Sequence, residues 1–302
     1  MSLNTSAAPL AREFIATSAL SGALWVIAGV AAFEGAGALV KFLGQSLSSF
    51  ELAFLRAAFG LPLVLLLWKD LRGIRHLRDP WIHLLRNVLG VVVLFSMAYA
   101  YTTLPLALVI TVFCGRIFMI IPLARVFLGE RIPWTAWIAS ATGFAGIIVS
   151  LLPKFGATGA TLIGALAALV AALCSASSQV SVRRLTDTNP PSTIMAVFTV
   201  FCVFATAPAA WWNWQTPQPA AWPWLVIMGL LAAVSQIFLA KGYRIIGASL
   251  SSPLSLLQLP ISTFLGFVLF REVPDAYGLA GAFLVLASAL HVTVACTRLA
   301  RC

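Results

Sequence analysis

Charged residues are scarce in this sequence, and their scarcity excludes most classes of soluble protein. Asp, Glu, Lys and Arg make up 9% of the 302 residues, and hydrophobic side chains make up 61%. A typical soluble domain is about 25% charged. Cysteine is also rare. Four of the five cysteines (Cys114, Cys174, Cys202 and Cys296) lie in long apolar runs and Cys302 is terminal, so the sequence predicts no disulfide framework.

Motifs for catalysis or metal binding are lacking as well. The sequence has no His-Glu-x-x-His pair, no glycine-rich phosphate loop and no Cys-x-x-Cys. Ser288 and His291 fall on one helix face, but no nearby carboxylate would orient the histidine. We therefore expect no enzyme, no metal and no cofactor. The net charge of +10 is divided among short loops, which argues against a nucleic-acid partner.

The chain does contain ten long apolar runs. About 20 apolar residues in a helix span the hydrocarbon core of a bilayer. Since the backbone in lipid must satisfy its own hydrogen bonds, and alternating ten-residue strands are absent, the runs are predicted to be helices. The sequence thus predicts an all-α integral membrane protein with ten transmembrane helices, at about 18–40, 48–68, 81–101, 105–124, 133–152, 161–182, 192–212, 223–243, 250–270 and 275–297.

The distribution of Lys and Arg predicts the orientation of these helices. With ten spans both termini lie on one side, and 13 of the 19 basic residues lie in the loops or tails of that side. The opposite loops hold only Lys41, Lys154 and Arg271. The positive-inside rule therefore places both termini in the cytoplasm, in a bacterial-type inner membrane. The outer loop between 192–212 and 223–243 is uncharged and rich in tryptophan, which predicts an interfacial belt or, alternatively, a binding lid.

The sequence repeats itself with an offset of 142 residues. Four short matches share that offset: Gly22 to Leu24 with Gly164 to Leu166, Lys41 with Arg183, Tyr101 with Tyr243, and Glu130 with Glu272. The repeating unit holds five helices, and because five is odd the second copy must be inverted. Inverted repeats around a midplane site are typical of transporters. The predicted units are 18–152 and 161–297, with cytoplasmic tails at 1–17 and 298–302.

Each half closes its fourth helix with a similar Glu-Pro turn. The segment is Phe127-Leu128-Gly129-Glu130-Arg131-Ile132-Pro133 in the first half and Phe270-Arg271-Glu272-Val273-Pro274 in the second. With these turns and the segment Phe50 to Arg56, the chain resembles the drug/metabolite transporter superfamily, EamA type. The resemblance implies a carrier whose relatives export amino acids, other metabolites or drugs, with a few uptake carriers. Phe118 stands where the second half has Pro260, so the two fourth helices are expected to bend differently.

Three charges lie near the middle of predicted spans: Glu34, Arg56 and Arg116. Each costs at least ~2.5–3.5 kcal/mol at that depth, so each should face protein or water. One interpretation is a substrate site. The alternative is a structural ion pair between Glu34 and one arginine. Two arginines and one glutamate leave a spare cation in either case.

Neutral polar residues complete the predicted site. Gln179, Gln236 and Gln258 are binding candidates because a buried amide needs partners, and Gln258 corresponds to Arg116 under the offset of 142. Tyr99 and Tyr101 are placed at the outer end of the third helix. They are candidates for a gate, with interface anchoring as the alternative.

Together these features predict a membrane transporter that exports small polar metabolites by alternating access. Amino acids are the expected substrates, since a zwitterion offers a carboxylate to Arg56 or Arg116 and an ammonium to Glu34. The alternatives are a multidrug or organic-ion exporter, a metabolite uptake carrier of the same fold, and a lipid scramblase. The expected partners are the small-molecule substrate and the bilayer, for a monomer or a homodimer.

Overall fold

The computed structural model describes residues 7–67, 78–129, 132–154, 159–212 and 214–299. Regular structure within these ranges is entirely helical, which confirms the predicted all-helical class. Short 3₁₀ turns occupy Leu152–Lys154 and Pro219–Ala221. The α-helices are α1 Ala7–Leu43, α2 Ser49–Leu67, α3 Pro80–Thr103, α4 Leu106–Phe113, α5 Arg116–Leu128, α6 Trp134–Leu151, α7 Gly159–Thr186, α8 Pro191–Trp212, α9 Trp222–Ser255, α10 Gln258–Phe270 and α11 Ala276–Leu299.

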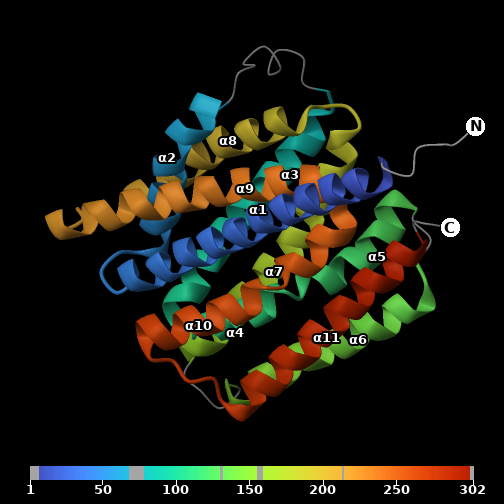
Figure 1. Cartoon of the computed structure of the whole chain (residues 1–302). Helices are drawn as coiled ribbons and strands as arrows, with labels where there is room; N and C mark the ends of the chain where they lie inside the picture. The colour runs from blue at the N-terminus through green and yellow to red at the C-terminus, as the bar shows by residue number, and fades with distance from the viewer. Residues whose placement is uncertain (1–6, 68–77, 130–131, 155–158, 213, 300–302) are drawn as a thin grey trace, which may run out of the picture.

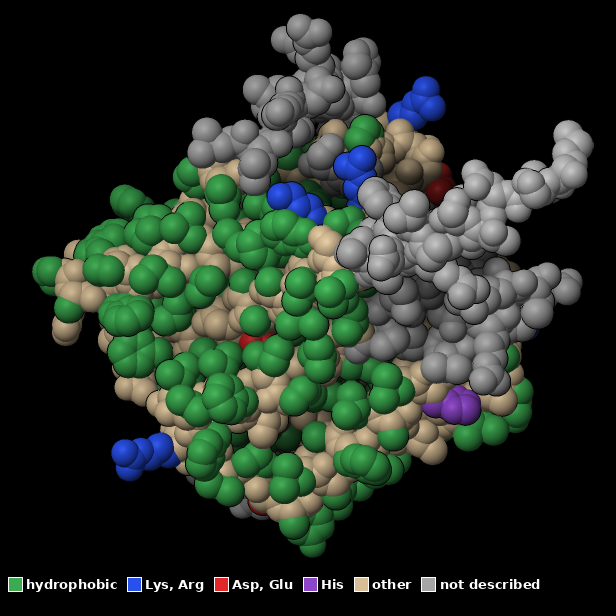
Figure 2. Space-filling model, in the orientation of Figure 1, with side chains coloured by type: hydrophobic (Ala, Val, Ile, Leu, Met, Phe, Trp, Pro, Cys, Tyr) green, Lys and Arg blue, Asp and Glu red, His purple; other side chains and the backbone are tan. Residues whose placement is uncertain are grey.

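Much of the described surface is apolar. Seven helical segments are long and apolar enough to cross a membrane, and the segments Gln258–Phe270 and Ala276–Val292 are apolar but shorter. Figure 2 shows hydrophobic side chains over most of the described part of one face, with the few Lys and Arg near its edges. Phe264 and Phe283 are 64% and 70% exposed. Such a surface suits lipid, although the exact count of ten crossing helices stays a prediction.

The helices pack in pairs that follow the sequence repeat. α1 contacts α9 and α3 contacts α7, while α2 packs on α8, α4 on α10 and α6 on α11. Under the offset of 142, α1 corresponds to α7 and α3 to the first part of α9. The first two contacts are therefore counterparts of each other. The α2–α8 and α6–α11 contacts each join an element to its own counterpart, whereas α4 packs on α10, the counterpart of α5. In Figure 1, α1 lies along α9 and α6 along α11.

Both fourth spans break, and they break at equivalent positions. In the first half, the turn Cys114–Gly115 separates α4 from α5, and in the second half α9 ends at Ser255 and α10 begins at Gln258. Both spans therefore break at this position although only the second half has Pro260, and a difference in their bend angles stays a prediction. Pro260 is the third residue of α10, and a residue in the first turn of a helix has no intrahelical partner for its backbone N–H, so proline costs little there.

The junction before this break differs between the halves. The sequence predicts separate spans at 223–243 and 250–270, with Lys241 and Arg244 in an inner loop, whereas α9 runs as one helix from Trp222 to Ser255. The corresponding junction in the first half contains Pro105, and Leu104 before it is extended (φ −122°, ψ 158°). Proline has no N–H to donate and disfavours helical geometry in the preceding residue. The second half has Gly247 at that position, which keeps the donor.

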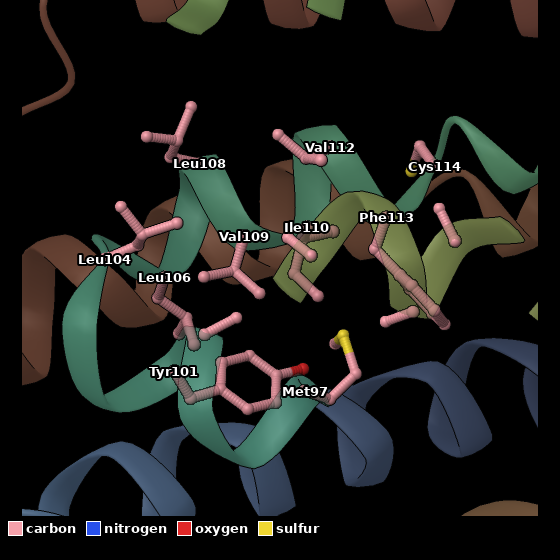
Figure 3. Close-up of a cluster of buried hydrophobic side chains, with 14 of the residues drawn as sticks. Met97, Tyr101, Leu104, Leu106, Leu108, Val109, Ile110, Val112, Phe113 and Cys114 are labelled. Carbon is pink, nitrogen blue, oxygen red and sulfur yellow. The ribbon is translucent and has the colours of Figure 1, made fainter. Parts of the chain in front are cut away.

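α4 forms the most deeply buried part of the bundle. Seven of its eight residues are buried, from Leu106 to Phe113. Figure 3 shows Leu106, Val109 and Phe113 of α4 on the side of Met97 and Tyr101 of α3. α4 is apolar except for Thr111, whose hydroxyl donates to the carbonyl oxygen of Ala107 over 2.8 Å, so it can lie inside the bundle without leaving a polar side chain unpaired. Phe113, at the C-terminal end of α4, and the turn that follows it lie in the region where the two halves meet.

Candidate functional site

A cavity of about 410 Å³ lies between helices of both halves. This volume falls in the range usual for small-molecule sites. Five of the six predicted binding residues line it: Arg56, Arg116, Gln179, Gln236 and Gln258. The structure thus brings together residues from α2, α5, α7, α9 and α10 that lie far apart in the sequence.

Arg116 and Gln258 owe their positions to the two helix breaks. Each is the first residue of the helix that follows a break, α5 in one half and α10 in the other. Arg116 Nη2 donates to Gln258 Oε1 over 3.3 Å, and Gln258 Nε2 donates to Cys114 Sγ over 3.0 Å. Since Arg116 and Gln258 are equivalent under the offset of 142, their hydrogen bond joins the two halves at the cavity wall. Broken helices near a repeat interface are a common way to build a transport site.

Three guanidinium groups line the cavity, each over a phenyl ring. The distances from guanidinium carbon to ring centroid are 4.2 Å for Arg116 over Phe113, 4.1 Å for Arg86 over Phe198 and 5.4 Å for Arg56 over Phe33. All six residues belong to the cavity lining, and no Asp or Glu is among the described lining residues. The rings attract the cations and fix the planes of the guanidinium groups. The wall therefore combines positive charge with flat apolar surfaces.

Arg86 was missed as a binding candidate in the sequence. It lies only five residues into the predicted span 81–101, where a basic side chain is ordinarily explained by the nearby interface. Nothing in its local sequence indicates that α3 points it inward toward Phe198 of α8. Tyr243 also lines the cavity. Tyr243 matches Tyr101 in the repeat, and this match could have identified Tyr243 as a candidate, but the sequence analysis used it only as evidence that the chain is duplicated.

Glu34 is the predicted binding residue that does not line the cavity. Its side chain is fully buried (0% exposed), and neither carboxylate oxygen accepts a hydrogen bond within the described part of the chain. Arg116 and Arg56 are the cations that act on it electrostatically. Neither of these arginines forms a close ion pair with it. Glu34 thus lies behind two arginines that face the cavity.

The two tyrosines predicted as gates lie in different surroundings. Tyr99 borders an open groove with Phe50, Phe95 and the tryptophans Trp211, Trp212 and Trp214. Tyr101 is fully buried, and its hydroxyl has no partner among the described residues. Tyr101 lies in the last turn of α3, at the helix end where the sequence places it, but its burial excludes the alternative of interface anchoring. Its ring packs over Gly37, which has no side chain to keep it out. A Cβ at Gly37 would lie 2.9 Å from Tyr101 Cζ. A gating role for either residue stays a prediction.

An ion pair joins three segments at the predicted outer side. Lys41 Nζ lies 2.5 Å from Glu272 Oε1 and 2.5 Å from the carbonyl oxygen of Leu104. Glu272 Oε2 accepts the backbone N–H of Leu106 over 2.8 Å. Glu272 therefore links the end of α10 to α1 and to the junction between α3 and α4. Its counterpart in the repeat, Glu130, lies outside the described residues.

Comparison with protein families adds evidence on what this arrangement is for. The model of the EamA-like transporter family matches the chain twice, over residues 20–152 and 162–294. A solved crystal structure superposes with a TM-score of 0.63 over 94% of this chain and 99% of the other, at 20% identity. At that identity the likeness shows a shared fold alone.

Similar proteins of known name carry diverse cargo. A riboflavin transporter of Rhizobium johnstonii is 31% identical over 284 residues, which is 91% of each chain. An S-adenosylmethionine uptake transporter of Rickettsia conorii is 27% identical, covering 90% of this chain and 92% of the relative. A pseudopaline exporter of Pseudomonas aeruginosa is 26% identical, covering 93% and 96%. These names describe transporters and not enzymes.

Proposed function

Because the chain belongs to the EamA-like transporter family, we propose that it moves small polar metabolites bearing a carboxylate across the membrane by alternating access, and that it exports amino acids. One observation carries this proposal. Arg56, Arg86 and Arg116 line a single cavity between the two halves, with no acidic side chain among its described lining residues. A transporter cavity with that wall favours anionic groups.

The chemistry of arginine narrows the proposed solute. A guanidinium group offers a planar fork of donors that matches a carboxylate and holds it through two charge-assisted hydrogen bonds. Gln179 and Gln236 add amide donors and acceptors to the same wall. In this proposal Arg56 and Arg116 hold the carboxylate of an amino acid, and the amide oxygens of Gln179 and Gln236 accept hydrogen bonds from its ammonium group. A cationic drug would meet three like charges and is disfavoured.

The proposed transport cycle rests on two inverted halves. We propose ten helices arranged as units 18–152 and 161–297, with both termini in the cytoplasm of a bacterial-type inner membrane. The paired helix contacts and the Arg116–Gln258 hydrogen bond support a repeat interface at the site. The cavity lining includes Val182 and Tyr243, both at predicted cytoplasmic helix ends. With the Lys41–Glu272 ion pair on the opposite side, this arrangement corresponds to a cavity that faces the cytoplasm.

A second candidate function is uptake of a larger metabolite with a planar ring system. The flat faces of Phe33, Phe113 and Phe198 on the cavity wall favour it, because aromatic rings prefer to stack or meet edge to face. The names of the riboflavin and S-adenosylmethionine relatives also support a substrate with a ring system. The shared feature of both candidates is a carboxylate or other electron-rich polar group that the arginines would hold.

A transport panel tests the proposal. Purified protein in liposomes would be assayed with labelled amino acids, S-adenosylmethionine, riboflavin, dicarboxylates and ethidium. Saturable transport of a carboxylate-bearing compound is expected, and its methyl ester should be transported poorly because the ester removes the anion that the arginines bind. Equal transport of the acid and the ester, or transport confined to ethidium, would contradict it. Transport of riboflavin alone would favour the second candidate.

A further inference from the structure

Glu34 differs from Glu51, the other buried carboxylate among the described residues. Glu51, which is 1% exposed, accepts hydrogen bonds from the backbone N–H and the hydroxyl of Ser48 and from the backbone N–H of Gln215. Glu34 is 0% exposed, and both of its oxygens lack a partner in the described part of the chain. A carboxylate buried in this way carries a large desolvation cost unless it binds a proton or gains a partner.

The groups around Glu34 come from several helices. The charged or titratable groups that act on it in the described structure are Arg116 of α5, Arg56 of α2, Tyr101 of α3 and Cys114 at the α4–α5 turn. Where α9 packs on α1, Leu239 and Leu231 lie closest to Gly29 and Gly35, and the cation of α9 on this contact, Lys241, lies over the Trp25 ring, nine residues before Glu34. Arg56 and Arg116 are therefore the only cations in this set.

These two arginines connect Glu34 to the cavity. Both line the cavity, whereas Glu34 does not. An ionised Glu34 and an anion in the cavity would therefore compete for the same positive charges. When no anion is bound, Arg56 and Arg116 stabilise the ionised form of Glu34. When an anion occupies them, that stabilisation weakens, and burial then favours the neutral carboxyl.

We propose that Glu34 is a proton-binding site whose occupancy is set by Arg56 and Arg116, so that an anionic solute in the cavity and a proton on Glu34 bind together. The claim that an anionic solute binds together with the proton rests on the proposed function. The claim that Glu34 binds a proton does not. By linkage, solute affinity rises as pH falls through the range in which Glu34 titrates, and solute binding takes up a proton. Where solute and proton move together, an imposed proton gradient drives the solute in the direction of proton flow. In a cell whose proton gradient points inward that direction is uptake, so coupled transport would favour the uptake carrier over the exporter.

Infrared difference spectroscopy tests the proton site without any solute. Full-length protein in liposomes would be titrated between pH 5 and pH 10, and the stretching band of a buried protonated carboxyl would be followed. The wild type should show a titrating band that is absent in Glu34→Gln. Arg56→Gln and Arg116→Gln each remove one cation, so each should move the midpoint of that band to higher pH, by about 1 pH unit or more.

Arg86 provides the matched control. It lines the same cavity and is stacked on Phe198, but it is not among the charges that act on Glu34. Arg86→Gln should leave the midpoint within about 0.3 pH units of wild type, because its charge lies away from Glu34. The proposal is overturned if the band is the same in wild type and Glu34→Gln, or if all three arginine variants shift the midpoint equally.

The transport assay tests coupling separately. For any solute that the panel identifies, the ratio of rates with and without an imposed pH gradient should exceed one in wild type and approach one in Glu34→Gln. An unchanged ratio in Glu34→Gln would refute the coupling even if the infrared band titrates as expected. If no panel solute is transported, the proposed function fails, while the infrared result still decides whether Glu34 binds the proton.

Discussion

At Arg86 the contribution of the positive charge to solute binding can be measured separately from that of the planar guanidinium group. Its guanidinium carbon lies 4.1 Å above the Phe198 ring at the cavity wall. A charge-assisted hydrogen bond contributes about 1.5–3 kcal/mol. Arg86→Met should therefore raise the KM for an anionic solute by about 10- to 100-fold. Arg86→Lys, which keeps the charge but loses the planar fork, should lie between wild type and Arg86→Met. Radiotracer transport in liposomes measures both, and a KM that Arg86→Met leaves unchanged would remove Arg86 from the site.

At this scale the sequence predicted five polar residues of the cavity wall and missed others for identifiable reasons. Charged or amide side chains in the middle of apolar runs are costly in lipid, which is why Arg56, Arg116 and the three glutamines could be identified. Arg86 lies near a predicted helix end, where an interface explains a cation equally well. The burial of Tyr101 could not be predicted, because it depends on Gly37, a neighbour 64 residues away that only the packing of α1 on α3 reveals.

At the scale of helices, the contact between α6 and α11 depends on glycine. A Cβ at Gly281 would lie 2.8 Å from the backbone nitrogen of Ser150, and closer still to Ser150 Oγ and to the carbonyl oxygen of Gly146. Gly281→Ala should lower the free energy of unfolding by about 1–3 kcal/mol through overpacking. Gly35→Ala is the control, since its nearest neighbour, Leu231 Cδ1, would be 3.5 Å away. Thermal unfolding in detergent compares the two, and equal midpoints would show that α6 and α11 are not held this closely.

Helix boundaries were predictable only where local chemistry determines them. Pro105 ends α3 because it lacks a donor, and its absence from the second half lets α9 continue through residue 247. The breaks at Cys114–Gly115 and at 256–257 have no proline at the break itself. α4 and α10 pack against each other at the junction of the two halves, next to both breaks. Gly115 is a weak local signal for the first break, because glycine weakens a helix interior, and the repeat offset relates the second break to the first.

For the whole molecule, the ion pair between Lys41 and Glu272 should help to keep the predicted outer side closed. Glu272→Gln removes the negative charge that attracts Lys41. A partly exposed ion pair of this kind stabilises the closed arrangement by up to ~1 kcal/mol. In a variant that retains only Cys114, an impermeant thiol reagent added outside should then react about 5-fold faster. Glu51→Gln is the control, because Glu51 caps α2 without contacting α10. No change in rate with Glu272→Gln would exclude this closing role.

The central claim is that one site between two halves of the chain is exposed to the two sides of the membrane in turn, and solute counterflow measures this most directly. Liposomes loaded with excess unlabelled solute would be diluted into a trace of the labelled compound. An alternating-access carrier should show saturable uptake of label with a transient overshoot, because inward and outward steps share the site lined by Arg56, Arg86 and Arg116. Flux that neither saturates nor responds to solute on the far side would contradict the account, since an open pore behaves in that way.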